Sequence, residues 1–364
     1  MTAIRSSVPE ESPGRLPPGV IVEGPLVDAK LRETYVILGV IYSGLIGALV
    51  WTITQGIGWV ELAVFVGIYS LTTIGIGVGM HRLLVHRSFR CGPVMRAFFC
   101  AIATMALQGS VLKWVSNHRR HHLYSDKPGD VHSPYYDGVG NRHDSFVKGM
   151  LHAHAGWSFD HVATDAEYYA KDILADPIAM FFVKTRWFWY AMSTILIPGA
   201  IGYAVGGIHT MIGCVLFSGF FRSYVMVMAT SLVNSVCHSD GHYGYRRFEL
   251  NDGTTNELVT TILTFGEGLH NNHHRFPRDA YLSHAWYEID INGLIIRGLG
   301  KLGLAHDIFV RPGRRASTVS TEQTSQAVIL NTANSRTSRS GPSAGIDQSL
   351  SDLFPDPAIR LRKI

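Results

Sequence analysis

Cysteine is scarce in this chain of 364 residues. Its four cysteines are far apart and include no CxxC pair: Cys91, Cys100, Cys214 and Cys237. A disulfide framework or a thiolate zinc site needs cysteines that are more numerous or closely paired. The sequence indicates neither, and we interpret Cys237, beside His238, as a small apolar helix residue.

Charged residues are also few, at 16% of the chain, whereas hydrophobic residues make up 46%. The formal net charge is only +4, and the basic residues are scattered along the sequence. Nucleic-acid-binding proteins usually gather basic residues on one face or stripe. The composition therefore argues against a nucleic-acid partner and fits either a large globular protein or a membrane protein.

Four apolar runs decide between these two classes. Each approaches the ~20 residues that a helix needs to cross a bilayer. They cover residues 35–53, 59–78, 187–205 and 211–233. We predict an all-α integral membrane protein with four transmembrane helices, and we expect the polar and aromatic segment 123–184 to form a cytoplasmic helical cap.

The basic residues are sorted by the side of the membrane on which they would lie. The short connections 54–58 and 206–210 contain no lysine or arginine. The other segments carry Arg82, Arg87, Arg90, Arg119, Arg120, Arg246, Arg247 and Arg275. By the positive-inside rule, these segments and both termini are predicted to face the cytoplasm.

The two ends of the chain differ from its middle. Residues 1–31 are rich in Pro, Gly and Ser and begin with no apolar signal-peptide core, so we expect a disordered cytoplasmic tail. Residues 311–364, rich in polar residues, are also expected to be disordered. The membrane domain would span 32–310, with an interfacial helix within 93–115 and an amphipathic cytoplasmic helix within 286–308.

Eight histidines lie in three clusters. These are His81 and His86; His118, His121 and His122; and His270, His273 and His274. On a helix, positions i, i+3 and i+4 point to one side, so the imidazoles of each HxxHH cluster are expected to converge on a single point. Such convergence is a metal-ligand arrangement, and all three clusters would lie on the cytoplasmic side. Five other histidines lack this spacing and are not predicted ligands: His132, His143, His152, His154 and His161.

With this order of HxxxxH, HxxHH and HxxHH, the chain resembles the membrane fatty-acid desaturases of the stearoyl-CoA desaturase type. The resemblance covers residues 34–309. Beyond the histidines it includes 81–89 (HRLLVHRSF), 105–108 (MALQ) followed by Trp114, 156–157 (GW), 232–238 (LVNSVCH), 266–277 and 303–305. It implies a ninth histidine ligand, His238, and a contact from Asn234 to a metal through water.

Nine imidazoles are enough for two metal ions, whereas a zinc site normally has three or four protein ligands. Neutral imidazole binds iron, copper, zinc and nickel, so histidine alone does not name the metal. The resemblance implies two Fe2+ ions and an O2-dependent reaction that removes hydrogen from adjacent methylenes and leaves a cis double bond. The metal centre supplies that chemistry, while the protein positions the acyl chain.

Ligand imidazoles need a partner on the second ring nitrogen. Three acidic residues lie close to a histidine in sequence, although each could equally be a surface acid. Glu267 precedes His270 by three residues, Asp126 follows His122 by four, and Asp240 follows His238 by two. These three carboxylates are the predicted partners.

Gln108, Trp114 and Thr230 match positions that line or bend the acyl tunnel in the family, and with Trp157 they are the predicted substrate-binding residues. The retained bend implies a double bond near the middle of a saturated chain, at Δ9. The head group stays open between CoA, lipid and acyl-carrier protein. Where the animal acyl-CoA enzymes hold CoA with polar and basic residues, this chain has Gly109, Ser116-Asn117 and Ser158-Phe159-Asp160.

Electrons are expected from a separate protein, because the sequence shows neither a Rossmann glycine fingerprint nor a heme-binding module. The resemblance implies a ferredoxin or cytochrome-b5-like donor with its reductase. A docking surface for an acidic donor is expected at Arg119, Arg120, Lys127, Arg246 and Arg247.

Three other functions fit parts of the pattern. A histidine-box hydroxylase has similar spacing, although the NSxxH segment and Gln108 favour desaturation. A metal transporter would place histidines within the membrane spans, whereas these lie at or beyond the cytoplasmic ends. A membrane zinc hydrolase would need an acid or nucleophile beside a three-ligand site, and it would act without oxygen.

Overall fold

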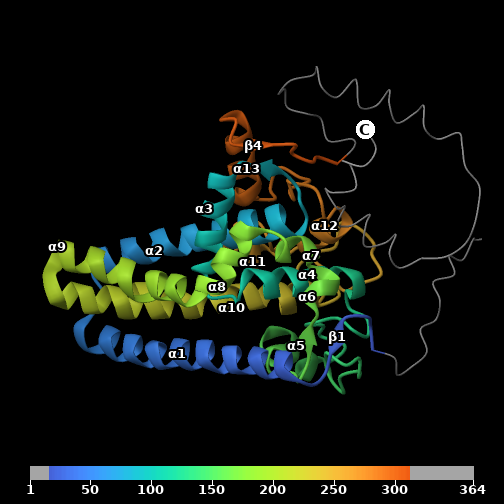
Figure 1. Ribbon diagram of the computed structural model, residues 1–364, viewed down its shortest axis with the longest axis horizontal. Coiled ribbons are helices and arrows are strands. Elements are labelled where there is room, and N and C mark those ends of the chain that lie inside the picture. The colour runs from blue at the N-terminus through green and yellow to red at the C-terminus, as the bar shows by residue number, and fades with distance from the viewer. Residues whose placement is uncertain (1–15, 312–364) are drawn as a thin grey trace, which may run out of the picture.

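Helices dominate the computed structural model, which describes residues 16–311 (Figure 1). The strands within this range are short antiparallel pairs. They are β1 (Val20–Ile21) with β3 (Ala163–Thr164), and β2 (Arg90–Cys91) with β4 (Ala305–His306). The mostly helical architecture agrees with the predicted all-α class.

Three continuous helical stretches among the described residues are long and apolar enough to cross a membrane. The first is α1 (Pro25–Gln55). The second is α2 (Trp59–Ile74), which continues as the π-helix η1 (Gly75–Val85). The third runs through α8 (Pro177–Ala191), η3 (Met192–Leu196), α9 (Ile197–Gly213), η4 (Cys214–Phe221), α10 (Arg222–Ser235) and η5 (Val236–His238).

The third stretch is not one straight helix. Gly206 and Gly207 depart from helical geometry inside α9, and Gly207 has a φ of 69°. A positive φ is strained for residues with a Cβ, which accounts for glycine at this point. The chain turns back here, so that α9 and η3 both pack against η4 (Figure 1).

The N-terminal boundary lies earlier than we predicted. Residues 16–31 were expected to be disordered, but β1 and the first turns of α1 occupy this segment. Pro25 starts the helix at a position that proline favours, and Val27 and Leu31 are buried against Ala163. No local pattern indicates this partner, because residue 163 lies far along the chain. The predicted tails in residues 1–15 and 312–364 lie outside the described residues.

Shorter helices form a cap at one end of the long ones (Figure 1). They are α3 (Pro93–Thr104), α4 (Val111–Tyr124), α5 (Phe146–His154), η2 (Gly156–Phe159), α6 (Ala166–Tyr169), α7 (Lys171–Leu174), α11 (Leu258–Leu263), α12 (His270–Arg275) and α13 (Ile291–Lys301). The amphipathic helix predicted within 286–308 is therefore shorter, and Trp286 lies outside it with 95% of its surface exposed.

Close packing holds η1, which carries the first histidines, against α3. A Cβ on Gly75 would lie 2.5 Å from the backbone nitrogen of Ala103, and one on Gly79 would lie 3.1 Å from the Cβ of Phe99. Around this contact lies the largest buried apolar cluster, which includes Val78, Phe99 and Ile296. The cluster fixes the end of the α2–η1 helix where the histidine site begins.

Candidate metal centre

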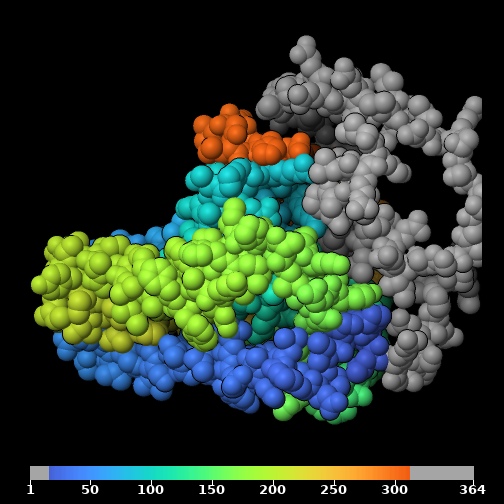
Figure 2. Space-filling model, in the orientation of Figure 1, coloured from blue at the N-terminus to red at the C-terminus, as the bar shows by residue number. Residues whose placement is uncertain are grey.

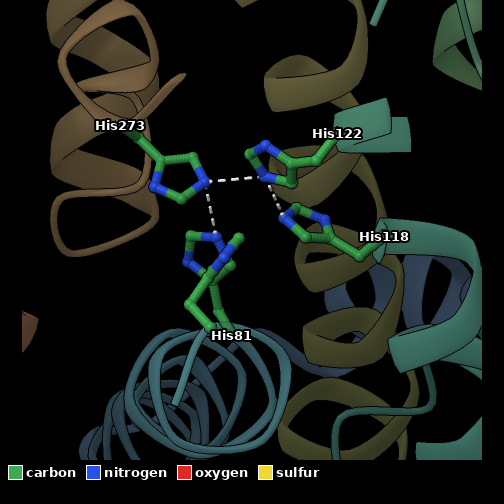
Figure 3. Close-up of side chains that lie close together, drawn as sticks. His81, His118, His122 and His273 are labelled. Atoms are coloured by element: carbon green, nitrogen blue, oxygen red, sulfur yellow. Dashed lines mark hydrogen bonds between the residues drawn. The ribbon is translucent and has the colours of Figure 1, made fainter. Parts of the chain in front are cut away.

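The first group contains five histidines. Four of them lie in η1, α4 and α12, and the fifth, His86, directly follows η1. The potential ligand atoms of His81, His86, His118, His122 and His273 lie within 4.8 Å of one another. Four of these rings point toward one another in Figure 3. The Nε2 atom of His273 lies 3.0 Å from that of His81 and 2.9 Å from that of His122.

The second group contains the remaining four predicted ligands, His121, His238, His270 and His274, again with potential ligand atoms within 4.8 Å. The two groups are adjacent, because the ring centroids of His122 and His274 are 4.5 Å apart. All nine histidines singled out from the sequence therefore lie in one region, divided five and four.

This division corrects the prediction that each HxxHH cluster converges on a single point. On α4, His118 and His122 join the first group while His121 joins the second. On α12, His273 joins the first group while His270 and His274 join the second. The helices lie between the two groups, and each helix supplies ligands to both.

The π-helix explains how His81 and His86 meet. Five residues at 100° each would place their side chains about 140° apart on an α-helix. The backbone nitrogen of His86 instead bonds to the carbonyl of His81 at 3.1 Å, the i→i+5 pattern of a π-helix. The ring centroids are consequently only 4.8 Å apart.

Carboxylates hold four histidines through the second ring nitrogen. Glu267 contacts Nδ1 of His81, and Asp126 contacts Nδ1 of His238 at 2.8 Å. Both carboxylates were predicted as partners, although each was expected beside a different histidine, Glu267 beside His270 and Asp126 beside His122. Sequence reasoning missed two others. Asp130 lies 2.8 Å from Nδ1 of His121, and Asp252 lies 3.0 Å from Nδ1 of His274.

Asp240, the third predicted carboxylate, does not hold a histidine. It forms an ion pair with Arg246 at 2.8 Å, and 64% of its side chain is exposed. Its φ of 50° places it in a turn directly after His238, so its side chain leaves the site. Proximity in sequence was misleading here because the chain reverses at this residue.

Burial favours the neutral form of five of these histidines. Burial, reinforced by neighbouring histidines, lowers the pKa well below its usual value in His118, His122, His270, His273 and His274. Burial alone would raise the pKa of Glu267, but the charges of His81 and Arg82 outweigh it and lower that pKa to about 2. Neutral imidazoles backed by ionised carboxylates are suitable metal ligands.

The arrangement of ring nitrogens fits a cation. His121 and His274 each direct Nδ1 at a carboxylate, which requires the proton on that nitrogen. When both rings are neutral, their Nε2 atoms are unprotonated, yet these atoms face each other at 3.3 Å. A metal ion between them would accept both lone pairs, whereas without one the two nitrogens repel.

Two cavities meet at the histidines. The first, of about 180 Å3, is lined by all four predicted substrate residues, Gln108, Trp114, Trp157 and Thr230. The second, of about 50 Å3, is lined by four histidines of the site and continues to Ile76, Met226 and Leu263. Trp114, Thr230 and Asn234 line both cavities, so an elongated apolar molecule in the two cavities would pass beside the histidines.

His132 was not predicted, yet it lies at the edge of this site. It lines both cavities, and its ring centroid lies 4.3 Å from that of His121. No spacing rule identifies it, because it comes from the loop after α4. Asn234 also faces the cavities from α10, beside the histidines rather than within either group.

Two residues of the expected docking surface are buried. Arg119 is 2% exposed and pairs with Asp172. Arg120 is 1% exposed and donates to the carbonyl oxygens of Gly129 and Gly138 at 2.8 and 3.0 Å. The prediction was wrong for both, because the loop after α4 covers Arg120 and helix α7 covers Arg119.

Comparison with known proteins indicates the same family as the sequence motifs. The family model described as fatty acid desaturase matches residues 35–297. The sn-1 stearoyl-lipid 9-desaturase of Anabaena variabilis is 34% identical over 266 residues, which cover 72% of this chain and 89% of the relative.

Two further relatives are named for other substrates. The hex-5-enoyl-(acyl-carrier protein) acetylenase of Moorena producens is 35% identical over 264 residues, covering 72% of this chain and 80% of the relative. The icosanoyl-CoA 5-desaturase of Limnanthes douglasii is 32% identical over 245 residues, covering 66% and 62%. The three names differ in acyl carrier and in reaction position.

Proposed function

Because this chain belongs to the fatty acid desaturase family and is therefore an oxidoreductase, we propose that it introduces a cis double bond at Δ9 of a saturated fatty acyl chain. The observation that carries the proposal is the path formed by the two cavities. Gln108, Trp114 and Thr230 line the part of this path that adjoins the histidines. An acyl chain in this path would present its middle methylenes to the histidine groups.

We propose two iron ions as the metals. The ligands would be the nine histidines of the two groups, with Asn234 contacting one metal through water. When bound, the irons supply the oxidising chemistry that uses O2 and two electrons. Asp126, Asp130, Asp252 and Glu267 would hold four of the rings in position and favour the tautomer that leaves Nε2 unprotonated.

The protein's own contribution is to hold the acyl chain. Trp114 stacks on His118 with ring centroids 4.9 Å apart and planes 6° apart, so it fixes both the ring and the wall of the path. The hydroxyl of Thr230 donates to the Met226 carbonyl at 2.8 Å, which satisfies its only donor. These contacts leave an apolar surface against the chain, and such positioning confines hydrogen removal to one pair of carbons.

We also propose four membrane crossings with the cap, the metal centre and both termini on the cytoplasmic side. The reversal at Gly206 and Gly207 supports two crossings within the third helical stretch. The two short connections without lysine or arginine support their placement on the opposite side. The membrane domain would then begin before residue 32, since β1 and α1 start earlier.

Electrons would come from a separate ferredoxin or cytochrome-b5-like protein. Of the basic residues expected to dock it, Lys127 is exposed and Arg246 and Arg247 are partly exposed. Arg246 and Arg247 already pair with Asp240 and Glu288. The proposed docking surface is therefore limited to these three cations.

Expression in a desaturase-deficient host tests the proposed reaction. The wild type is expected to produce a new Δ9 monoene, and His273→Ala is expected to produce none. Double-bond position and lipid class are both measured. Unchanged acyl chains in cells that hold well-expressed, iron-loaded protein and a competent electron donor would contradict desaturation and favour a hydroxylase.

A further inference from the structure

The carboxylates that hold histidines are divided unequally between the two groups. In the second group, three of the four rings have such a partner: Asp130 lies beside His121, Asp126 beside His238 and Asp252 beside His274. Among the described residues, the first group has one ion pair of this kind, between Glu267 and His81. Three carboxylates therefore support the second group and one supports the first.

The three carboxylates of the second group take other hydrogen bonds from neutral donors. Asp252, for example, accepts from the hydroxyls of Thr254 and Ser125 at 2.6 and 3.2 Å. The donors to the other two carboxylates are the backbone nitrogens of Gly253, Asp126 and His132 and the hydroxyl of Ser133. Neutral donors hold the carboxylates in place without cancelling their charge, so this negative charge acts on the second group.

Glu267 differs from these three, because a buried cation lies beside it. Its Oε1 accepts a hydrogen bond from Nη2 of Arg82 at 3.1 Å. Arg82 also binds Asp290 through both terminal nitrogens, at 2.8 and 3.1 Å, and it is only 1% exposed. Charges interact strongly in buried surroundings, where the effective dielectric constant is low. Arg82 therefore offsets much of the negative charge that Glu267 presents to His81.

Helix α13 keeps this cation in place. Asp290 precedes the helix and accepts from the backbone nitrogen of Gly293 at 2.9 Å, and Asn292 donates to Oε1 of Glu267 at 2.9 Å. Figure 2 shows the orange segment after α13, which contains β4, lying on the cyan segment that contains β2, and these two strands pair. The start of α13 thus holds Arg82 and Glu267 together beside the histidines.

The charge beside each group sets the order of metal affinity. Three negative charges adjoin the second group, whereas Glu267, Arg82 and Asp290 together carry one beside the first. Loss of one partner that orients a ligand typically lowers metal affinity about 10–100-fold. The first group has one more imidazole, but a neutral ring adds no charge to balance a buried divalent cation. We therefore expect the difference in charge to outweigh the fifth ligand.

We propose that the second group fills with metal before the first group, which binds its metal ion at least about tenfold more weakly. The proposal rests on the proposed function, with its two iron ions, and describes how that centre is filled. Arg82 is a positioning residue, because it acts on the first group through Glu267. Since the proposed centre needs both ions, occupancy of the first group would set the fraction of chains that are active.

Equilibrium binding of Fe2+ in the absence of oxygen tests the order of filling. The full-length protein, stripped of metal in detergent, is titrated against a competing chelator, and the bound iron per chain is measured. The wild type is expected to bind one Fe2+ per chain before the other, with the two steps at least about tenfold apart. Binding of both ions in a single step would overturn the proposal.

Two histidine variants assign the steps to the groups. Each variant removes one ligand from one group and leaves all four carboxylates in place. His118→Ala, in the first group, is expected to lose the weaker step and keep the tighter one. His270→Ala, in the second group, is expected to lose the tighter step. The reverse assignment would show that the first group fills first, contrary to the proposal.

The role of Arg82 is tested by Arg82→Gln combined with Asp290→Asn. The two amides remove both charges of the pair, so no buried charge is left unpaired between them. Without the cation beside Glu267, the weaker step is expected to tighten several-fold, a gain that misfolding cannot produce. The matched control is Arg311→Gln with Asp279→Asn, an ion pair at 2.9 Å outside the histidine groups, for which neither step should change. An unchanged weaker step in the Arg82 variant would contradict its assigned role.

Metal binding does not require turnover, so the two proposals fail separately. If iron binds in the expected order but the loaded protein forms no double bond from any acyl substrate, the proposed reaction is wrong and the order of filling stands. If a double bond forms but both ions bind in one step, or the first group fills first, the reaction stands and the order of filling is wrong.

Discussion

Asp126 accepts hydrogen bonds from Nδ1 of His238 and from the backbone nitrogen of Gly253, each at 2.8 Å, so it fixes the orientation of that imidazole. Asp126→Asn removes the charge that holds the ring and is expected to lower metal affinity about 10–100-fold. The measurement is iron retained per protein during competition with a chelator.

Asp240→Asn is the matched control for this change, because Asp240 lies only two positions from His238 in sequence but pairs with Arg246 at the surface. It is expected to retain as much iron as the wild type. Equal iron loss in the two variants would show that the contact between Asp126 and His238 does not support the metal site.

His152 provides a pH-dependent prediction outside the histidine groups. Its Nε2 lies 3.0 Å from Asp160, and its Nδ1 lies 3.1 Å from the Ser133 carbonyl. Burial opposes protonation, but the hydrogen bond and charge of Asp160 outweigh it and raise the pKa of His152 above its usual 6.5. The resulting stabilisation is fully present below pH 6.5 and is lost as the pH rises through the raised pKa.

His152→Gln is therefore expected to lower the thermal midpoint more at pH 6 than at pH 9. His161→Gln, at an exposed histidine of the same cap, is expected to have a small effect at both values. Thermal unfolding in detergent measures both variants. If His152→Gln lowers the thermal midpoint equally at pH 6 and pH 9, the ion pair between His152 and Asp160 is contradicted.

The residues identified from the sequence carry a local signal, whereas those that were missed depend on contacts between separate segments. Spacing on a helix identified the histidines of the two HxxHH clusters, because periodicity is local and survives folding, whereas His238 was identified only from the family resemblance. Asp252 reaches His274 across 22 positions through an irregular loop, and no local pattern encodes that contact. Arg119 and Arg120 seemed available for docking because nothing in their own segment reveals the loops that cover them.

At the scale of elements, the close contact between η1 and α3 predicts that one added methyl group lowers the stability of the protein. Gly75→Ala would place Cβ 2.5 Å from the Ala103 nitrogen, and neither backbone can move without disturbing the histidine end of η1. Such overpacking is expected to cost about 1–3 kcal/mol of unfolding free energy. The thermal midpoint of the purified protein measures it.

Gly67→Ala supplies the comparison on the same continuous helix. Its Cβ would meet no atom within 4 Å, and alanine favours a helix over glycine by roughly 0.5–1 kcal/mol. This variant is expected to be neutral or slightly more stable. A similar loss of stability at both positions would contradict the assignment of the effect to the contact with α3.

The π-helical geometry of η1 shows why element types were easier to predict than their details. The apolar run 59–78 predicted a helix correctly, and α2 with η1 fills it. The run did not predict that hydrogen bonding would change to i→i+5, which brings His86 beside His81. The same segment packs closely against α3, and a one-dimensional pattern contains neither feature.

For the whole molecule, the proposed four crossings place the turn at Gly207 and the cap on opposite sides of the membrane. Ile208→Cys, exposed beside this turn, is expected to react with a membrane-impermeant maleimide on intact cells. Trp286→Cys, exposed on the cap side, is expected to react only after lysis. The wild type is the control, since three of its cysteines are buried and Cys91 is partly buried. Labelling of both variants on intact cells would contradict this topology.

The histidine groups join segments that are distant along the chain, with His81 and His273 separated by 192 positions. A ribosome synthesises all three long apolar helical stretches within residues 16–311 before it reaches α12. Until then, neither group has the ligands that α12 contributes. Loading of the proposed metals would therefore be a late step of biogenesis, acting on a chain whose long apolar helices are already made. Metal shortage would leave a pool of membrane-embedded apoprotein that can be activated without new synthesis.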